Sequence, residues 1–302
     1  LGRGERDAAM TALTSALSRE PAAMAELHRL VPVLGGEHVL ARYRMDGSKA
    51  IGAFEASGRR YDAPQVLVFD YMAARIFEDG SSLELVHTIE KAQSDEAVDR
   101  LAEVQVPQGA RILTLHTIKP DGQRLEPDEI AGKDAISLPT VAPGDYVELE
   151  YIVAKEPATS FSNGYLGDRF YFKSFEIPFD HSHMVMILPK SMDAKIDPRG
   201  PAPTLQEQDI DGLRVLTFKV DESKPLTPEP NSPSAREFLP SIRLSVHATW
   251  SAFVDSIRDV LVDNDVYDVE IAELVRQLVG NASVGDKKAR SERLYRWVLA
   301  NI

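Results

Sequence analysis

Two histidines separated by one residue are the first side chains in this sequence that could act together in chemistry. They stand in the segment 180–183, which reads DHSH. On a β-strand alternate side chains point to the same face, so His181 and His183 could ligate one metal ion. The sequence marks no third ligand, and a polar strand edge or turn between Pro178 and the apolar run Met184–Leu188 explains the same residues. We therefore predict no metal site and no cofactor. A metal-dependent hydrolase that uses the two histidines stays open as an alternative.

Two glutamates and two further histidines also have spacings or settings that could suit chemistry. Glu148 and Glu150 share one face of a predicted strand, as a general acid and a general base could. The simpler interpretation is that they form the solvated side of that strand. His87 and His116 fall within strands on apolar faces, which is typical of core histidines with satisfied hydrogen bonds. We expect none of the four to be catalytic.

Aromatic residues gather between residues 161 and 175 and could build a binding surface. Along a strand, Phe170 and Phe172 would face one way, and Tyr171 and Phe175 the other. One set could fill the core while the other lines a groove for a sugar or a peptide. We predict a candidate binding groove formed by Tyr165, Tyr171 and Phe175. Core packing against a second sheet explains the same residues and also stays open. The cluster consists of Phe161, Tyr165, Phe170, Tyr171, Phe172 and Phe175.

Composition excludes several classes of function. The chain has 302 residues and no cysteine, so disulfides, thiolate metal sites and thiol nucleophiles are excluded for these residues. Its net charge is 34 minus 47, or −13, and this negative field repels nucleic acid and anionic lipid. No apolar run approaches the roughly 18 residues of a membrane span. The patterns GxSxG, HExxH, GxxxxGK and GxGxxG are absent from the sequence.

The elements that must position these side chains are mostly strands. Alternating apolar and polar residues between 64 and 248 predict a sheet with one packed and one wet face. Asp-Gly pairs at residues 79–80, 121–122 and 211–212 predict tight hairpin turns. One short helix is predicted at Asp95–Glu103. We predict an antiparallel β-sandwich domain over residues 64–248. Its strands are predicted at Val66–Phe77, Leu83–Lys91, Arg111–Ile118, Tyr146–Val153, Arg169–Ile177, Met184–Leu188 and Leu213–Val220.

Helical segments flank the predicted sandwich, so the fold class is mainly β with helical ends. Residues 1–60 predict a helical hairpin, which is either the end of a helical repeat array or a capping hairpin without a repeat. The proline-rich segment Lys224–Pro240 is expected to run extended. Residues 249–302 predict helices with apolar stripes. The last, Arg290–Ile302, has no stop signal after its apolar face, so we expect that face to pack on elements that follow. The face is formed by Leu294, Val298 and Ile302.

The order of several short motifs resembles a known family. The motifs are FEDGSSLELVH at 77–87, KPDGQRLEP at 119–127, LPTVAPGDYVELEYIV at 138–153, RFYFKSFEIPF at 169–179 and SIRLSVHATW at 241–250. Together they resemble a bacterial domain of unknown function that directly precedes transglutaminase-like domains. The resemblance covers about residues 64–260. It implies a β-sandwich module of cell-envelope or secreted multidomain proteins, and hence an extracytoplasmic or periplasmic location, although a cytoplasmic one is not excluded.

The resemblance also implies what would follow this chain. The segment RLYRWVLANI at 293–302 is similar to the helix that leads into a papain-like catalytic domain, in which Cys, His and Asp perform acyl transfer. The cysteine has no matching position here, so residues 249–302 are expected to be the helical lead-in of that domain. We expect a non-catalytic module that positions a protein or peptide substrate, with the downstream transglutaminase-like domain of the same polypeptide as its partner. A stand-alone adhesion or carbohydrate-binding sandwich is a second possibility.

Overall fold

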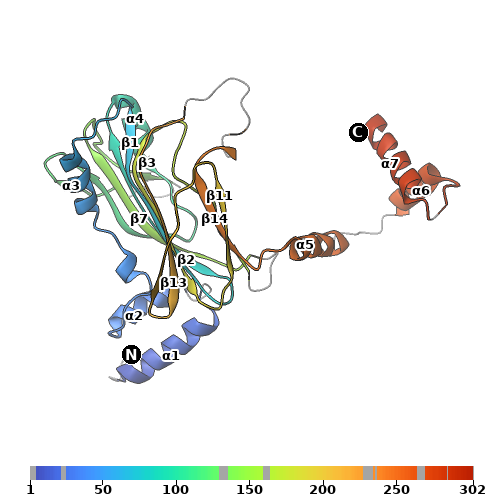
Figure 1. Ribbon diagram of the computed structural model, residues 1–302, viewed down its shortest axis with the longest axis horizontal. Helices are drawn as coiled ribbons and strands as arrows, with labels where there is room; N and C mark the ends of the chain where they lie inside the picture. Colours follow the sequence, from blue (N-terminus) through green and yellow to red (C-terminus); the bar gives the residue numbers. More distant parts are fainter. Residues whose placement is uncertain are drawn as a thin grey trace. The chain divides into compact units, whose positions relative to one another are not determined.

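The computed structural model describes residues 5–21, 25–128, 135–158, 164–226, 234, 237–263, 269–283 and 285–301, without the side chains of residues 25, 26 and 259–263. Within it the chain forms two compact units, Leu1–Thr249 and Trp250–Ile302 (Figure 1). The first unit holds every strand of the described residues, and the second holds helices. The chain is mainly β and sandwich-like, which confirms the predicted fold class.

A large mixed sheet forms the centre of the first unit. Its strand order is β12-β13-β10-β1-β2-β7-β4-β5. Neighbouring strands are antiparallel except for β1 and β10, which pair in parallel. In this order the bounds are Gln206–Ile210, Leu213–Ser223, Phe179–Pro189, Gln65–Ile76, Ser82–Ala92, Tyr146–Lys155, Arg111–Ile118 and Arg124–Leu125.

A smaller sheet packs on one face of the large one. It consists of β11 (Ala194–Arg199), β14 (Ser241–Val246) and β8 (Tyr165–Leu166), and β9 (Phe170–Tyr171) also pairs with β14. Further along the same face of the large sheet, the side chains of β4 and β7 pack on α4 (Asp95–Leu101), which precedes a two-stranded ribbon. The ribbon pairs β3 (Glu103–Val104) with β6 (Ile136–Ser137). Leu216, Phe218 and Leu244 lie in the core between the two larger sheets. We call this side of the large sheet its inter-sheet face.

The opposite face is covered by the N-terminal segment, and we call it the helix-covered face. The segment holds α1 (Arg6–Arg19), η1 (Ala25–Arg29), α2 (Leu30–Val33), η2 (Ala41–Tyr43) and α3 (Gly47–Ser57). Figure 1 shows α3 on one side of the large sheet and β11 with β14 on the other. The backbone N–H of Lys49 donates to the side chain of Asp46 at the start of α3, and the helix ends at Gly58, whose φ is +65°. Phe54 of this helix lies in the core of the helix-covered face.

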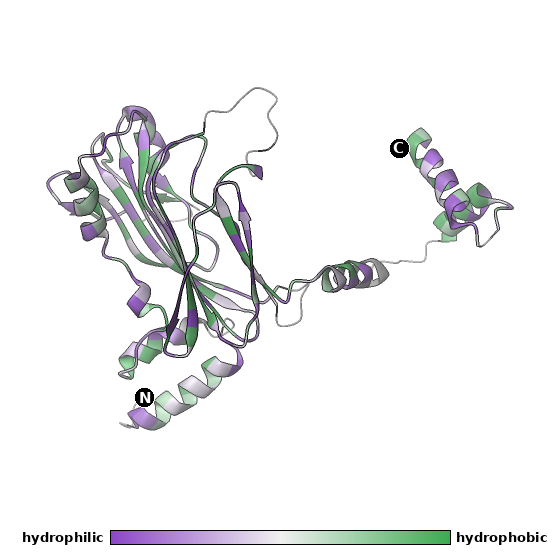
Figure 2. Ribbon diagram, viewed as in Figure 1, coloured by the Kyte–Doolittle hydropathy of each residue, from purple (hydrophilic) through white to green (hydrophobic). Residues whose placement is uncertain are grey.

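The expectation of one wet sheet face is wrong for the central strands. Hydrophobic and hydrophilic residues do alternate along the strands (Figure 2), but both faces of the large sheet are covered. Alternation fails as a guide here because buried ion pairs and hydrogen-bonded side chains occupy polar positions on the helix-covered face. Strand bounds are mostly as predicted, and Arg111–Ile118 is observed without change.

Two strand predictions need correction. The predicted strand Arg169–Ile177 shortens to Phe170–Tyr171. The predicted strand Met184–Leu188 begins earlier, at Phe179, so His181 and His183 lie inside β10 and not in a polar edge or turn. The three Asp-Gly pairs stand at hairpin turns, where Gly80, Gly122 and Gly212 adopt φ values of +86°, +87° and +81°. Most of the proline-rich segment lies outside the described residues.

The second unit contains α5 (Trp250–Asp263), α6 (Val269–Val279) and α7 (Lys287–Asn301). Apolar side chains on these helices are exposed: Trp250 is 82% exposed and Val298 is 44% exposed. Leu294 is half-buried, and Ile302 lies outside the described residues. The packing face formed by these α7 residues stays a prediction. Among the described residues, no helix is both long and apolar enough to cross a membrane.

Candidate functional site

A groove with a volume of about 530 Å³ lies between the inter-sheet face of the large sheet and the segment that follows β9. Strands β1 and β2 supply its floor, and residues 171–177 supply one wall. Aromatic and aliphatic side chains form most of its lining, with a few polar groups among them. Binding sites for small molecules and peptides commonly have this composition. The lining consists of Leu67, Thr88, Glu90, Tyr171, Lys173, Ser174, Phe175, Glu176, Ile177, Phe179 and Leu239.

An irregularity in β1 determines which side chains reach this floor. The register with β2 shifts between Leu67 and Phe69, so that Leu67 pairs with Glu90 and Asp70 pairs with Thr88. Residues that pair across neighbouring strands share a face, and Thr88 and Glu90 both line the groove. The shift therefore places Leu67 and Asp70 on the groove side, while Val68 and Phe69 both pack on the helix-covered face.

Two carboxyl groups at the floor have altered acidity: Glu90 lines the groove, and Asp70 pairs with Thr88 beside it. Burial raises the pKa of Asp70 to about 7, and repulsion from Glu90 adds to this increase. Burial also raises the pKa of Glu90, against the effect of a hydrogen bond that the Gln65 amide donates to it. Both side chains are only partly exposed. Near neutral pH this pair can hold a proton or attract a cation.

Asp70→Asn is expected to stabilise the protein at pH 8 by on the order of 2 kcal/mol and to change little near pH 4. The folded wild type holds a proton on Asp70 up to about pH 7, whereas the unfolded chain releases it near pH 4. Wild-type stability therefore falls as pH rises through this window, and the asparagine variant lacks that loss. Urea unfolding followed by far-ultraviolet circular dichroism across the window measures the difference.

Asp180→Asn is the matched control. Asp180 is also a buried carboxylate, but it lies on the helix-covered face and has a charged partner, Arg59. The substitution should destabilise the protein at pH 8 because it leaves Arg59 without its closest carboxylate. Equal effects of the two substitutions on the free energy of unfolding at pH 8 would contradict the conclusion that the Asp70 carboxylate lacks a cationic partner.

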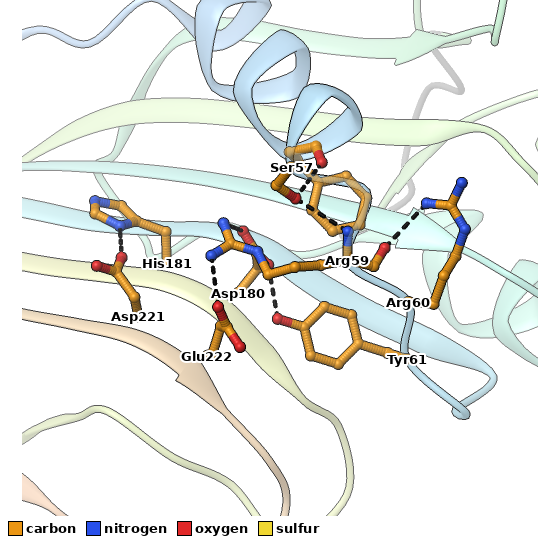
Figure 3. A network of polar contacts seen from close by, with 9 residues as sticks. Ser57, Arg59, Arg60, Tyr61, Asp180, His181, Asp221 and Glu222 are labelled. Atoms are coloured by element: carbon orange, nitrogen blue, oxygen red, sulfur yellow. Dashed lines mark hydrogen bonds and ion pairs between the residues drawn. The ribbon is translucent and has the colours of Figure 1, made fainter.

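The helix-covered face carries a polar network (Figure 3), and a second, smaller cavity lies beside it. The Arg59 guanidinium lies 2.8 Å from Asp180 and 3.1 Å from Glu222, and the Tyr61 hydroxyl donates to Asp180 over 2.6 Å. His181 pairs with Asp221 of β13. These groups come from the chain just after α3 and from β10 and β13, so the network fastens the N-terminal segment to the sheet. The cavity, of about 290 Å³, opens beside Asp180 and His181.

Glu148 and Glu150 also lie on the helix-covered face, and the expectation that they are solvated is wrong. Their residues are 4% and 2% exposed. Glu148 Oε1 lies 3.0 Å from His87 Nε2, and Glu150 accepts a 2.9 Å bond from Arg44 Nε. His87 is buried, as expected of a core histidine, with 1% of its surface exposed, but its Nδ1 has no hydrogen-bond partner among the described residues, so the expectation of satisfied hydrogen bonds is confirmed only for Nε2. A Cβ on Gly47 would lie 1.8 Å from Glu148 Oε1, so glycine allows the start of α3 to approach this pair.

His181 and His183 share the helix-covered face, but their partners differ. Their ring centroids are 6.1 Å apart and the rings are nearly perpendicular. His181 pairs with Asp221, while His183 Nε2 is buried without a hydrogen-bond partner in the described part of the chain. Burial lowers the pKa of His183 to about 3, so its ring stays neutral. Across the described residues, no group of three or more His, Cys, Asp or Glu side chains is arranged to hold a metal ion.

The structure brings together two of the three residues predicted to form the groove. Tyr171 and Phe175 both line it. Tyr165 lies instead in the core between the sheets, with its hydroxyl 3.5 Å from Glu84. Sequence reasoning missed Asp70 and Glu90. The signal for Asp70 was present, because it is an acid within the apolar run Val66–Ile76.

Comparison with known proteins finds a family model that matches part of the chain. Residues 133–227 match a family described as a Domain of Unknown Function with solved-structure structure (DUF3857). No curated protein matches the chain. A solved structure of a "putative protease" from Parabacteroides distasonis ATCC 8503 is similar, with 14% identity and a TM-score of 0.60. The match covers 79% of this chain and 50% of that one, so this chain spans about half its length.

A weaker likeness is to an M1 zinc metallopeptidase from Deinococcus radiodurans. The identity is 15% and the TM-score 0.35, over 60% of this chain and 42% of that one. A TM-score this low carries no argument about fold or function. The comparisons thus show a fold shared with the Parabacteroides protein and, at residues 133–227, a domain of unknown function.

Proposed function

We propose that this chain is a non-catalytic module that positions a protein or peptide substrate for a transglutaminase-like or protease-type domain of the same polypeptide. The groove lined by Tyr171 and Phe175 is the observation that carries this proposal. Its aromatic and aliphatic walls suit peptide side chains, and its floor offers carboxyl groups for orientation. The likeness in fold to the Parabacteroides protein supports a place beside a protease-type domain.

The chain's own residues favour binding over catalysis. It contains no cysteine, which is the nucleophile that cysteine acyl transfer requires. His87, the most buried histidine beside a carboxylate, is enclosed with Glu148 in the core and does not face the groove. In this proposal the catalytic cysteine belongs to the downstream domain, which would pack on the exposed face of α7 near Val298. An extracytoplasmic location is part of the same proposal.

Two assays on the purified chain test this function. Amidase, protease and transamidation substrates should show no turnover, and blocked hydrophobic peptides should bind. Tyr171→Ala and Phe175→Ala should each weaken peptide binding, whereas Phe253→Ala on α5 is the control and should not. Robust turnover by this chain alone would overturn the proposal.

A carbohydrate-binding role is the second candidate, because Tyr171 and Phe175 are both partly exposed in the groove. Aromatic faces of this kind also stack on sugars. A glycan array that shows binding lost in Tyr171→Ala, together with no binding of the blocked peptides, would favour this role over the peptide-positioning one.

A further inference from the structure

We propose that the groove recognises a lysine side chain of the bound peptide, with the ammonium group at Asp70 and Glu90 and the methylene stem along Tyr171 and Phe175. The inference rests on the proposed function, since it specifies the chemistry of the peptide that the groove holds. It is carried by two features that are independent of each other, the apolar walls and the acidic floor.

The walls suit the stem of a long side chain. Leu67, Ile177, Phe179 and Leu239 line the groove together with the two aromatic rings. A lysine side chain carries four methylene groups that pack on apolar surface, while its charge stays at the tip. A groove of about 530 Å³ has room for such a side chain and for parts of its neighbours in a peptide.

The floor suits the charge at the tip. Asp70 and Glu90 lie on neighbouring strands two pairing positions apart on one face, and Glu90 raises the electrostatic cost of ionising Asp70. A cation placed beside both would remove that cost, which is the form of complementarity that selects a positively charged ligand. Glu90 and Glu176 line the groove together with one ammonium group, that of Lys173, and Asp70 pairs with the lining residue Thr88 on the same face of the sheet.

Lys173 is the alternative partner for these carboxyl groups. Within the described residues it forms no ion pair with Asp70 or Glu90, although it lines the same groove. If the groove takes a cation from outside, Lys173 repels it, and Lys173→Met should strengthen binding of a lysine peptide. Weaker binding in that variant would overturn the proposal, because Lys173 would then be part of the recognition.

The test compares two blocked peptides that differ only in the ammonium group. Acetyl-Leu-Lys-Leu-amide and its norleucine counterpart are titrated into the full chain at pH 8, with calorimetry or NMR shifts as the readout. We expect the lysine peptide to bind about tenfold more tightly. Asp70→Asn and Glu90→Gln should reduce this ratio towards one while binding of the norleucine peptide persists. His181→Gln, on the helix-covered face, is the matched control and should preserve the ratio.

A pH series on the wild type provides a test that needs no variant. Asp70 loses its proton through about pH 7, so affinity for the lysine peptide should rise between pH 6 and pH 8. The peptide amine stays charged throughout, and the norleucine peptide should show little change. The charged groups that line the groove beside Asp70 are Glu90, Lys173 and Glu176.

The outcomes separate this inference from the function on which it rests. Equal affinity for the two peptides at pH 8 would overturn lysine recognition and leave the peptide-positioning function standing. Failure of both peptides to bind would overturn both. A glutamate counterpart that binds more tightly than the lysine peptide would overturn the charge assignment alone.

Discussion

His87→Leu is expected to lower the free energy of unfolding of the first unit by about 3 to 5 kcal/mol. The imidazole is the hydrogen-bond partner of Glu148, and both side chains are almost fully buried. Leucine fills a similar volume but leaves the carboxylate in the core without this partner. Urea unfolding followed by far-ultraviolet circular dichroism measures the loss. Tryptophan fluorescence would not, because Trp250 and Trp297 both lie in the second unit.

The pH dependence of this loss has a definite sign. Burial raises the pKa of Glu148, but the hydrogen bond and charge interaction with His87 outweigh burial and leave that pKa below its ordinary value. The pair therefore contributes stability above the carboxyl pKa of the unfolded chain, and this contribution disappears as pH falls through the lower pKa of the folded state. The difference between wild type and His87→Leu should accordingly shrink in acid.

The double variant His87→Leu, Glu148→Leu is the control for this prediction. It removes the buried charge together with its partner, so it should recover most of the stability that the single variant loses. A double variant no more stable than His87→Leu would show that the loss comes from altered packing and not from the stranded carboxylate.

Phe172→Ala is expected to destabilise the first unit by about 3 to 5 kcal/mol. The Phe172 side chain is fully buried between the two sheets, and its ring lies 4.9 Å from that of Phe170 in an edge-to-face arrangement. Truncation removes these contacts and leaves a cavity that the paired sheets cannot readily close. The same denaturation experiment measures the effect.

Phe175→Ala is the matched control, because the same chemical change occurs three residues later in the wall of the groove. Phe175 is partly exposed, so its loss should cost no more than about 1 kcal/mol while weakening peptide binding. A loss as large as that of Phe172→Ala would contradict the assignment of Phe175 to the groove and Phe172 to the core.

The sequence predicted the strands and turns well where local chemistry decides them. Asp-Gly supplies the positive φ angles of a tight turn, so the hairpins at Gly80, Gly122 and Gly212 could be located from two residues each. The predicted bounds Arg111–Ile118 are those of β4 in the structure. In these cases no contact with residues distant in the sequence overrides the preference of the segment for a turn or a strand.

Predictions that depended on what covers a strand were less successful. Glu148 and Glu150 alternate with apolar residues, as solvated side chains do, yet the segment around Arg44 and Gly47 covers them. That coverage comes from residues about one hundred positions away. The prediction that His181 and His183 lie in a polar edge or turn failed for the same reason. The pairing with β1 and β13 extends β10 back to Phe179, and the sequence around the histidines does not reveal this pairing.

The groove could be predicted only in part. Tyr171 and Phe175 were predicted from their aromatic character and spacing, and both line it. The acidic floor depends on the register shift in β1, which turns Asp70 towards Thr88 and the groove. A shift of one residue is a property of two paired strands, and periodicity within one strand cannot reveal it.

The parallel pairing of β1 with β10 has a consequence for how this protein is made. Leu67 pairs with Phe179, which enters the nascent chain 112 residues later. Until β10 leaves the ribosome, β1 has β2 on one side and an unpaired row of backbone groups on the other. Contacts so distant in sequence form slowly, because a long loop must close before they can stabilise the sheet. During synthesis this exposed edge is where a chaperone would be most effective and where two nascent chains would be most apt to associate.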